Sequence, residues 1–151
     1  MNKQDILSQI IDSLRAELDT CLNAAKAASS AATDPDSKAE NKYDTRSLEA
    51  SYLARGQAFR VGELQDAVHA FETLNVRRFD ETDVAGLGAL VTLKTESEES
   101  HYFLGPAAGG TEVHDVMVIT PGSPLGQKLM GRKAGDKVPM PGGQALVVAV
   151  Q

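Results

Sequence analysis

The first half of the chain carries two seams of apolar and small residues with heptad spacing, and they constrain the fold more than any other feature. The first seam is spaced 4, 3, 4, 3, 4, 3, 4 and consists of Leu7, Ile11, Leu14, Leu18, Cys21, Ala25, Ala28 and Ala32. The second is spaced 3, 4, 3, 4, 3, 4, 3 and consists of Ser47, Ala50, Ala54, Gln57, Val61, Leu64, Val68 and Phe71. This is the a/d pattern of a coiled coil. The sequence therefore predicts two long helices packed against each other.

The two seams match when the helices run antiparallel. Leu14 then lies opposite Leu64 and Ala28 opposite Ala50, so that paired residue numbers add to 78 or 79 and the turn centres near residue 39. Alanines occupy the end beside the turn. Because burial stabilises by roughly 25 cal/mol per Å² of apolar area and alanine buries little, this end should be thin. Such a hairpin either reaches into another molecule, lies along a partner, or dimerises as a four-helix bundle.

Glycine and proline divide the chain near residue 75. Residues 1–75 contain two glycines and one proline, whereas residues 76–151 contain eleven glycines and five prolines. Since these residues punctuate turns, we expect an antiparallel coiled-coil hairpin over residues 1–75 and a domain of short strands over residues 76–151. Four apolar runs predict strands, namely Ala89–Leu93, His101–Leu104, Val116–Ile119 and Ala145–Val150. The segment RKAGDKV leads to a further short strand.

One short helix is expected among these strands. Ser123 followed by Pro124 is typical of a helix start, with serine as the N-cap and proline at the first helical position. The apolar face of this helix is formed by Leu125, Leu129 and Met130. Gly131 would cap its end. The predicted fold class is therefore α+β, with an N-terminal helical hairpin followed by a small antiparallel sheet crossed by one short helix.

Composition excludes several classes of protein. Acidic residues outnumber basic ones 21 to 15, so a chain with a formal net charge of -6 does not bind nucleic acid through bulk positive charge. No run approaches the roughly 18 apolar residues of a membrane span. The single cysteine, Cys21, rules out an internal disulfide and fits a reducing compartment. No P-loop, CxxC or Ser-His-Asp arrangement indicates an enzyme. We expect a soluble, cytoplasmic protein without a membrane partner.

The predicted turn carries carboxylates at helical spacing. A helix that starts at Asp34 and Pro35 would place three acids on one face, because they are four residues apart. These acids are Asp36, Glu40 and Asp44. Capping and the helix dipole ordinarily explain acids in a first helical turn, but they explain the second and third of these less well. The alternative is that the carboxylates hold a hard cation such as Mg²⁺, with part of the coordination shell supplied by a partner.

Two strings in the second half resemble the Gre family of bacterial transcript cleavage factors. They are ITPGSPLGQKLMGRKAGDKV (119–138) and MPGGQALVVAV (140–150). The C-terminal domain of this family has a similar segment. It begins with Ser-Pro, then leucine or isoleucine, then glycine, and it continues with Gly-Asp. A Pro-Gly-Gly turn and a final strand follow. The string SLRAELD (13–19) also resembles the first helix of the family, so the resemblance covers essentially the whole chain.

The resemblance implies both a fold and a function. It implies a helical hairpin and an FKBP-like C-terminal domain, which docks on bacterial RNA polymerase beside the secondary channel. The hairpin of such a protein enters the channel, and its acidic tip helps to hold Mg²⁺ at the polymerase active centre. The polymerase then hydrolyses the 3′ end of a backtracked transcript. The chain would thus be no enzyme itself and would act on the nascent RNA 3′ end only indirectly.

The resemblance also assigns residues. The cleavage-stimulating residues would be Asp36 and Glu40, and the Mg²⁺ ligands would be these two with Asp44 in reserve. The tip departs from the family pattern here, because its acids are four residues apart where family acids are three apart, and Lys42 replaces the downstream acid or the alanine before it. The segment that faces polymerase corresponds to Ser123, Pro124 and Leu125. A helix start that packs the domain explains Leu125 at least as well.

Three other functions stay open at this point. The altered acid spacing favours a protein that occupies the secondary channel and modulates transcription, or competes with Gre factors, without stimulating cleavage. An FKBP-like domain suggests a prolyl isomerase or chaperone, but the second half offers only Phe79, Tyr102 and Phe103 for an aromatic pocket. The last alternative is a structural hairpin that dimerises. The exposed alanine-rich segment favours a monomer.

Overall fold

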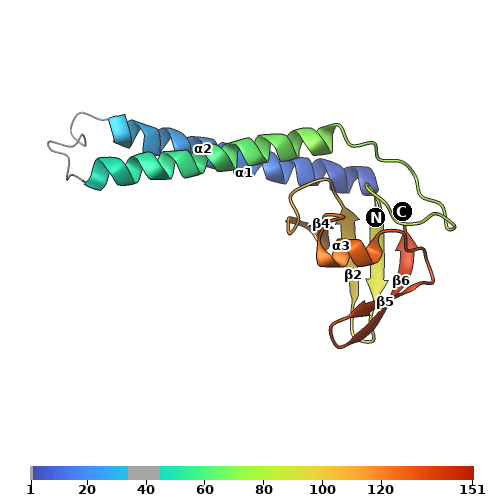
Figure 1. The fold of residues 1–151 in the computed structure, drawn as a ribbon. Coiled ribbons are helices and arrows are strands. Elements are labelled where there is room, and N and C mark those ends of the chain that lie inside the picture. Colours follow the sequence, from blue (N-terminus) through green and yellow to red (C-terminus); the bar gives the residue numbers. More distant parts are fainter. Residues whose placement is uncertain (1, 34–44) are drawn as a thin grey trace. The chain divides into compact units, whose positions relative to one another are not determined.

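The computed structural model describes residues 2–33 and 45–151, and its first half consists of two long helices (Figure 1). They are α1 (Lys3–Thr33, 31 residues) and α2 (Thr45–Glu72, 28 residues). The strands are β1 (Leu90–Lys94), β2 (Glu99–Leu104), β3 (Glu112–Val113), β4 (Val116–Ile119), β5 (Lys137–Met140) and β6 (Gly143–Val150), and α3 (Pro124–Leu129) lies between β4 and β5. The predicted α+β class with an N-terminal helical hairpin is confirmed, and each predicted strand begins and ends within two residues of an observed one.

The chain packs into two compact units that do not follow the change from helix to strand. One unit combines Met1–Asp12 with His69–Gln151, and the other is Ser13–Val68. The start of α1 and the end of α2 thus pack in the same unit as the sheet. The division into residues 1–75 and 76–151 was read from composition and stays a prediction.

The unit Ser13–Val68 is a thin pair of helices. Its buried apolar side chains are Leu14, Leu64, Ala67 and Val68. No side chain is buried at residues 18–27 or 55–61, where the predicted seam positions are half-buried and Phe59 is 73% exposed. Among the residues whose side chains the structure describes, this part of the pair therefore has no core of its own.

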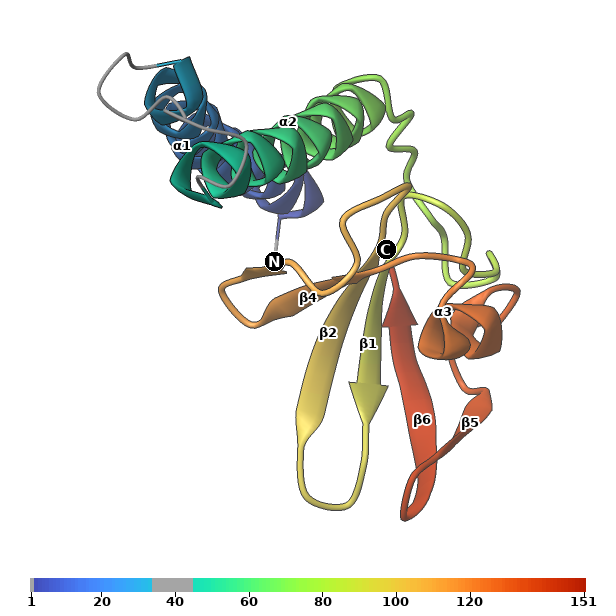
Figure 2. The ribbon, with the colours of Figure 1, turned by 60° about the vertical axis from the view of Figure 1, so that its left-hand side comes forward.

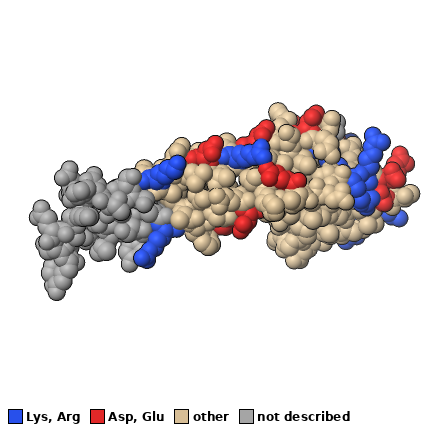
Figure 3. Space-filling view, turned by 90° about the horizontal axis from the view of Figure 1, so that it is seen from above, with Lys and Arg blue, Asp and Glu red and all other residues tan. Residues whose placement is uncertain are grey.

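One ion pair supports the predicted antiparallel register. The guanidinium of Arg60 on α2 donates to the carboxylate of Glu17 on α1, and the two residue numbers add to 77, close to the predicted 78 or 79. The hydrogen bond to Glu17 raises the pKa of Arg60 above its ordinary value. Charges of both signs are interspersed over the described face in Figure 3. The predicted turn centre near residue 39 lies outside the described residues.

The predicted seam is wrong at the start of α1. Ile6 and Ile10 are buried there, with 4% and 0% of their surface exposed, whereas the predicted seam residues Leu7 and Ile11 are only half-buried. The physical reason is that Met1–Asp12 packs in the unit that contains the sheet, so its buried face is not set by pairing with α2 alone. Heptad spacing describes only a helix that packs along one partner helix.

The six strands form one mixed sheet in the order β3-β4-β2-β1-β6-β5 (Figure 2). The prediction of an antiparallel sheet is wrong at one pair, because β2 and β4 are parallel, with His101 opposite Val116 and Leu104 opposite Ile119. The chain reverses direction twice between β2 and β4. It first forms the two-residue strand β3, and it then turns back into β4, which pairs antiparallel with β3. The second reversal uses a positive φ of 51° at His114. A two-residue strand has no hydrophobic pattern by which it can be recognised.

The sheet buries side chains on both faces. On one face, Leu129 of α3 belongs to a core cluster with residues of β1, β2, β5 and β6, among them Val91, Leu93, Leu104, Val138 and Val147. Phe103 alternates with Leu104 along β2, and its ring centroid lies 6.3 Å from that of Phe71 at the end of α2. The sheet is thus held between α3 and the end of α2. In the parts of the chain that the structure describes, no helix is long and apolar enough to span a membrane.

Candidate functional site

The acidic residues of the predicted tip lie outside the part of the chain that the structure describes. This applies to Asp36, Glu40 and Asp44, to Lys42, and to the helix start predicted at Asp34. Their predicted roles in cleavage and in Mg²⁺ binding therefore stay predictions. Within residues 2–33 and 45–151, no group of three or more histidine, cysteine, aspartate or glutamate side chains is arranged to hold a metal ion.

The predicted polymerase-facing segment forms the start of α3. Ser123 is the N-cap, with φ -71° and ψ 157°, and its hydroxyl accepts a hydrogen bond of 3.0 Å from the backbone N–H of Gly126. The same hydroxyl donates to the carbonyl oxygen of Thr120 at 2.7 Å. Pro124 occupies the first helical position and is exposed. Both predictions, the serine cap and the proline start, are confirmed, and Pro124 is free to contact a partner.

Two leucines of this helix pack toward the core. Leu125 is half-buried against the core cluster and Leu129 is fully buried. The helix ends at Leu129, and Met130 is its C-cap, so the prediction that Met130 forms part of the apolar helix face is wrong. Gly131, the predicted cap, follows Met130 with φ +80°, a left-handed conformation that glycine adopts without a Cβ clash. The helix thus ends at Leu129, one residue before the end that the apolar pattern predicted.

Three exposed apolar residues that sequence reasoning missed lie on two chain segments that meet beyond the end of α3. They are Val84 (49% exposed), Leu87 (43%) and Met130 (38%), here called the Met130 patch. Backbone hydrogen bonds from Ala85 N–H to Arg132 C=O, 2.6 Å, and from Gly131 N–H to Ala85 C=O, 2.8 Å, hold the two chain segments together. Neither segment has helical or strand periodicity, so no sequence signal indicated the patch. Clustered exposed apolar side chains are typical of surfaces that bind another protein.

Replacing the capping serine tests whether Ser123 stabilises the fold. We expect Ser123→Ala to lower the free energy of unfolding by about 1 kcal/mol, because the N–H of Gly126 loses its acceptor. Ser123→Thr keeps the hydroxyl and should retain most of the stability. Urea unfolding followed by circular dichroism measures both values. Equal stability of the alanine variant and the parent protein would show that the cap contributes nothing.

Comparison with known proteins finds several similar solved structures. No protein-family model matches the sequence, and no curated protein matches it either. GreA factor homolog 1 (Gfh1) of Thermus thermophilus is 20% identical with a TM-score of 0.41, covering 93% of this chain and 94% of that one. A structure described as the transcription factor Gfh1 (21%, TM-score 0.40) and Gfh1 of Thermus aquaticus (20%, 0.40) each cover 93% of this chain and 92% of their own.

Proposed function

We propose that this chain is a Gre-like transcription factor that binds bacterial RNA polymerase at the secondary channel and stimulates Mg²⁺-dependent cleavage of backtracked transcripts. The observation that carries the proposal is the thin helix pair of Ser13–Val68, which buries no side chain at residues 18–27 or 55–61 in its described part. Helices that pack so little gain little stability from their length. Their length is better explained by reach into a narrow space.

The proposed chemistry belongs to the polymerase, and the chain contributes carboxylates. Asp36 and Glu40, with Asp44 in reserve, would supply oxygen ligands, the type that Mg²⁺ prefers. Two or three carboxylates leave most of an octahedral shell to other ligands, so the polymerase, its RNA and water would supply the rest. Bound there, Mg²⁺ would activate the attacking water and stabilise charge on the phosphate.

The FKBP-like domain would provide the docking surface. Of the three residues assigned by resemblance, Ser123 and Leu125 are engaged within the domain, whereas Pro124 is exposed. We propose that Pro124 and the Met130 patch, which lie at the two ends of α3, together contact the polymerase. The protein would act as a monomer and would act on the nascent RNA 3′ end indirectly, through the polymerase active site.

A cleavage assay tests the proposed function. Purified RNA polymerase is stalled in a backtracked complex with labelled RNA, and the protein is added with Mg²⁺. We expect short 3′ fragments, and we expect the double variant Asp36→Ala, Glu40→Ala to slow their release by at least about 100-fold, since a metal ion supplies several kcal/mol of charge stabilisation. The matched control is Glu63→Ala, Asp66→Ala, which removes two exposed acids of α2 and should cleave normally.

The same complexes distinguish the second candidate function. The four-residue spacing of Asp36 and Glu40 and the presence of Lys42 favour a protein that occupies the channel and modulates transcription without cleavage. That function predicts polymerase binding, measured by fluorescence anisotropy of labelled protein, with no released fragments. Fragment release that persists in the double variant would show that the acids are wrongly assigned. Absence of polymerase binding would contradict both functions.

The aromatic residues of the second half weigh against an isomerase. Phe103 is fully buried against Phe71, and Phe79 and Tyr102 pack against the core cluster and line different cavities. An FKBP-type isomerase pocket would need such rings around one cavity. We therefore propose no isomerase function for this domain.

A further inference from the structure

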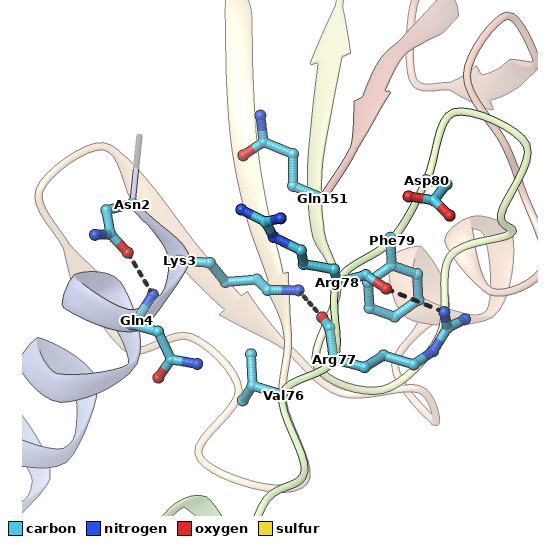
Figure 4. A pocket seen from close by; sticks show the side chains of 9 residues that line it. All are labelled: Asn2, Lys3, Gln4, Val76, Arg77, Arg78, Phe79, Asp80 and Gln151. Atoms are coloured by element: carbon cyan, nitrogen blue, oxygen red, sulfur yellow. Dashed lines mark hydrogen bonds between the residues drawn. The ribbon is translucent and has the colours of Figure 1, made fainter.

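A cavity lined by cationic side chains lies at the N-terminus of α1, within the unit that contains the sheet (Figure 4). Its volume is about 640 Å³, and its walls come from the start of α1, from residues 76–80 after α2, and from Gln151. Three of its lining side chains are cationic, namely Lys3, Arg77 and Arg78, and one is a carboxylate, Asp80. This concentration of positive charge contrasts with the net charge of -6 of the whole chain.

Two of the three cations have partners in the surrounding structure. The ammonium group of Lys3 donates to the carbonyl oxygen of Arg77 and lies 4.6 Å from the centroid of the Phe79 ring. The guanidinium of Arg77 lies 4.0 Å from the same centroid and forms an ion pair of 3.1 Å with Asp83. Asp83 also accepts a hydrogen bond of 2.8 Å from the backbone N–H of Asp80, which closes the loop. These contacts join the start of α1 to residues 77–83 across the cavity wall.

Arg78 differs from the other two cations. Its carbonyl oxygen accepts a hydrogen bond from the Arg77 guanidinium, but its own guanidinium has no hydrogen bond or ion pair among the described residues. The side chain is exposed and lines the cavity. Its five N–H donors in fork geometry suit an oxyanion that accepts two hydrogen bonds side by side. Among the three cations, Arg78 is therefore the one whose side-chain donors are all unused in the described structure.

Two further features favour an anion in this cavity. Partial burial, and then the positive charge of Arg77, lower the pKa of Lys3, so an added negative charge would relieve the repulsion between these neighbours. The cavity also lies at the N-terminus of the 31-residue helix α1, where backbone N–H groups give a partial positive charge. Asn2 accepts from the N–H of Gln4 at 2.9 Å. Asn2 thus satisfies one of the N–H donors at this helix end.

We propose that this cavity binds a phosphate group of a nucleotide or a polynucleotide, through Arg78 with the support of Lys3 and Arg77. A terminal phosphate presents three oxygens and up to two charges to the three cations, whereas a single carboxylate presents two oxygens and one charge. A backbone phosphodiester carries one charge, but successive phosphates of a polynucleotide can meet more than one of the cations. Lys3 and Arg77 already contact the Phe79 ring, so the proposal assigns the phosphate, and no stacked base, to this cavity. This binding is independent of the function proposed above.

Titrations of the ¹⁵N-labelled full chain test the proposal. One titration uses pyrophosphate, and the other uses a short oligoribonucleotide without a terminal phosphate. We expect saturable shifts of the amide signals of Lys3, Gln4, residues 76–80 and Gln151. We expect Arg78→Ala to weaken binding by at least about tenfold, because a hydrogen bond to a charged group contributes about 1.5–3 kcal/mol. Lys133→Ala removes an exposed cation that does not line the cavity and should bind normally.

The outcomes separate the two sources of phosphate from a wrong proposal. Binding of pyrophosphate alone would indicate a free or terminal phosphate, and binding of the oligoribonucleotide would indicate a backbone phosphate. Either result supports the proposal if Arg78→Ala weakens it, and Arg78→Lys should weaken it less because the charge is kept. Absence of shifts with both probes, or equal binding by Arg78→Ala and the parent protein, would overturn it. No polymerase is present in this experiment, so its failure leaves the proposed cleavage function standing.

Discussion

Gly126→Ala is expected to destabilise the C-terminal domain by about 3 kcal/mol or more. A Cβ atom at this position would lie 1.8 Å from the carbonyl oxygen of Thr120 and 2.8 Å from the hydroxyl oxygen of Ser123. The first of these atoms belongs to the backbone and cannot rotate away. The loop before α3 must therefore move, which disrupts the cap on the Gly126 N–H and shifts the fully buried Leu129. Urea unfolding followed by circular dichroism measures the loss.

A second glycine in the same loop provides the matched control. A Cβ atom at Gly122 would meet nothing within 4 Å, and its φ is not in the left-handed region. Gly122→Ala should therefore change the free energy of unfolding by less than about 0.5 kcal/mol. If the two variants lost equal stability, general loop rigidity would explain the result, and the close approach of α3 to Thr120 would not.

The start of α3 shows which parts of this fold are predictable from sequence. Ser123 and Pro124 act through contacts within a few residues, so their residue types alone predict the cap and the helix start. The role of Gly126 depends on the path of the preceding loop, which no local pattern encodes. The parallel pairing of β2 with β4 escaped prediction for a related reason, because it depends on a two-residue strand between them.

The two candidate sites, the start of α3 and the cavity at the start of α1, also differ in how far they could be predicted from sequence. The sequence string that contains Ser123, Pro124 and Leu125 could be compared directly with a known family. The cavity at the start of α1 could not, because the hydrogen bond from Lys3 to Arg77 joins residues 74 positions apart. Arg77 and Arg78 of this cavity belong to the segment NVRRFDETD (75–83). This segment has no periodic apolar pattern, so the sequence predicts only a boundary between domains there. The two adjacent arginines were the only sequence feature that could have indicated the cavity, and adjacent charged residues ordinarily lie on a solvent-exposed surface.

Phe71→Ala is expected to lower the free energy of unfolding by about 3–5 kcal/mol. The Phe71 ring is fully buried, and its centroid lies 6.3 Å from that of Phe103 on β2. It also occupies the space beside Gly105, where a Cβ atom would come within 2.7 Å of the ring. Truncation therefore leaves a cavity between α2 and the sheet. Thermal and urea unfolding measure the loss.

Phe59 is the matched control, because it lies on the same helix and is 73% exposed. Phe59→Ala should change stability by less than about 0.5 kcal/mol. Amide hydrogen exchange then locates the effect of Phe71→Ala. Since Phe71 packs in the unit of His69–Gln151, exchange should accelerate in β2, where Phe103 loses its partner. Acceleration confined to residues 55–61 would mean that Phe71 serves the helix pair alone, and the assignment of the end of α2 to the sheet unit would then be wrong.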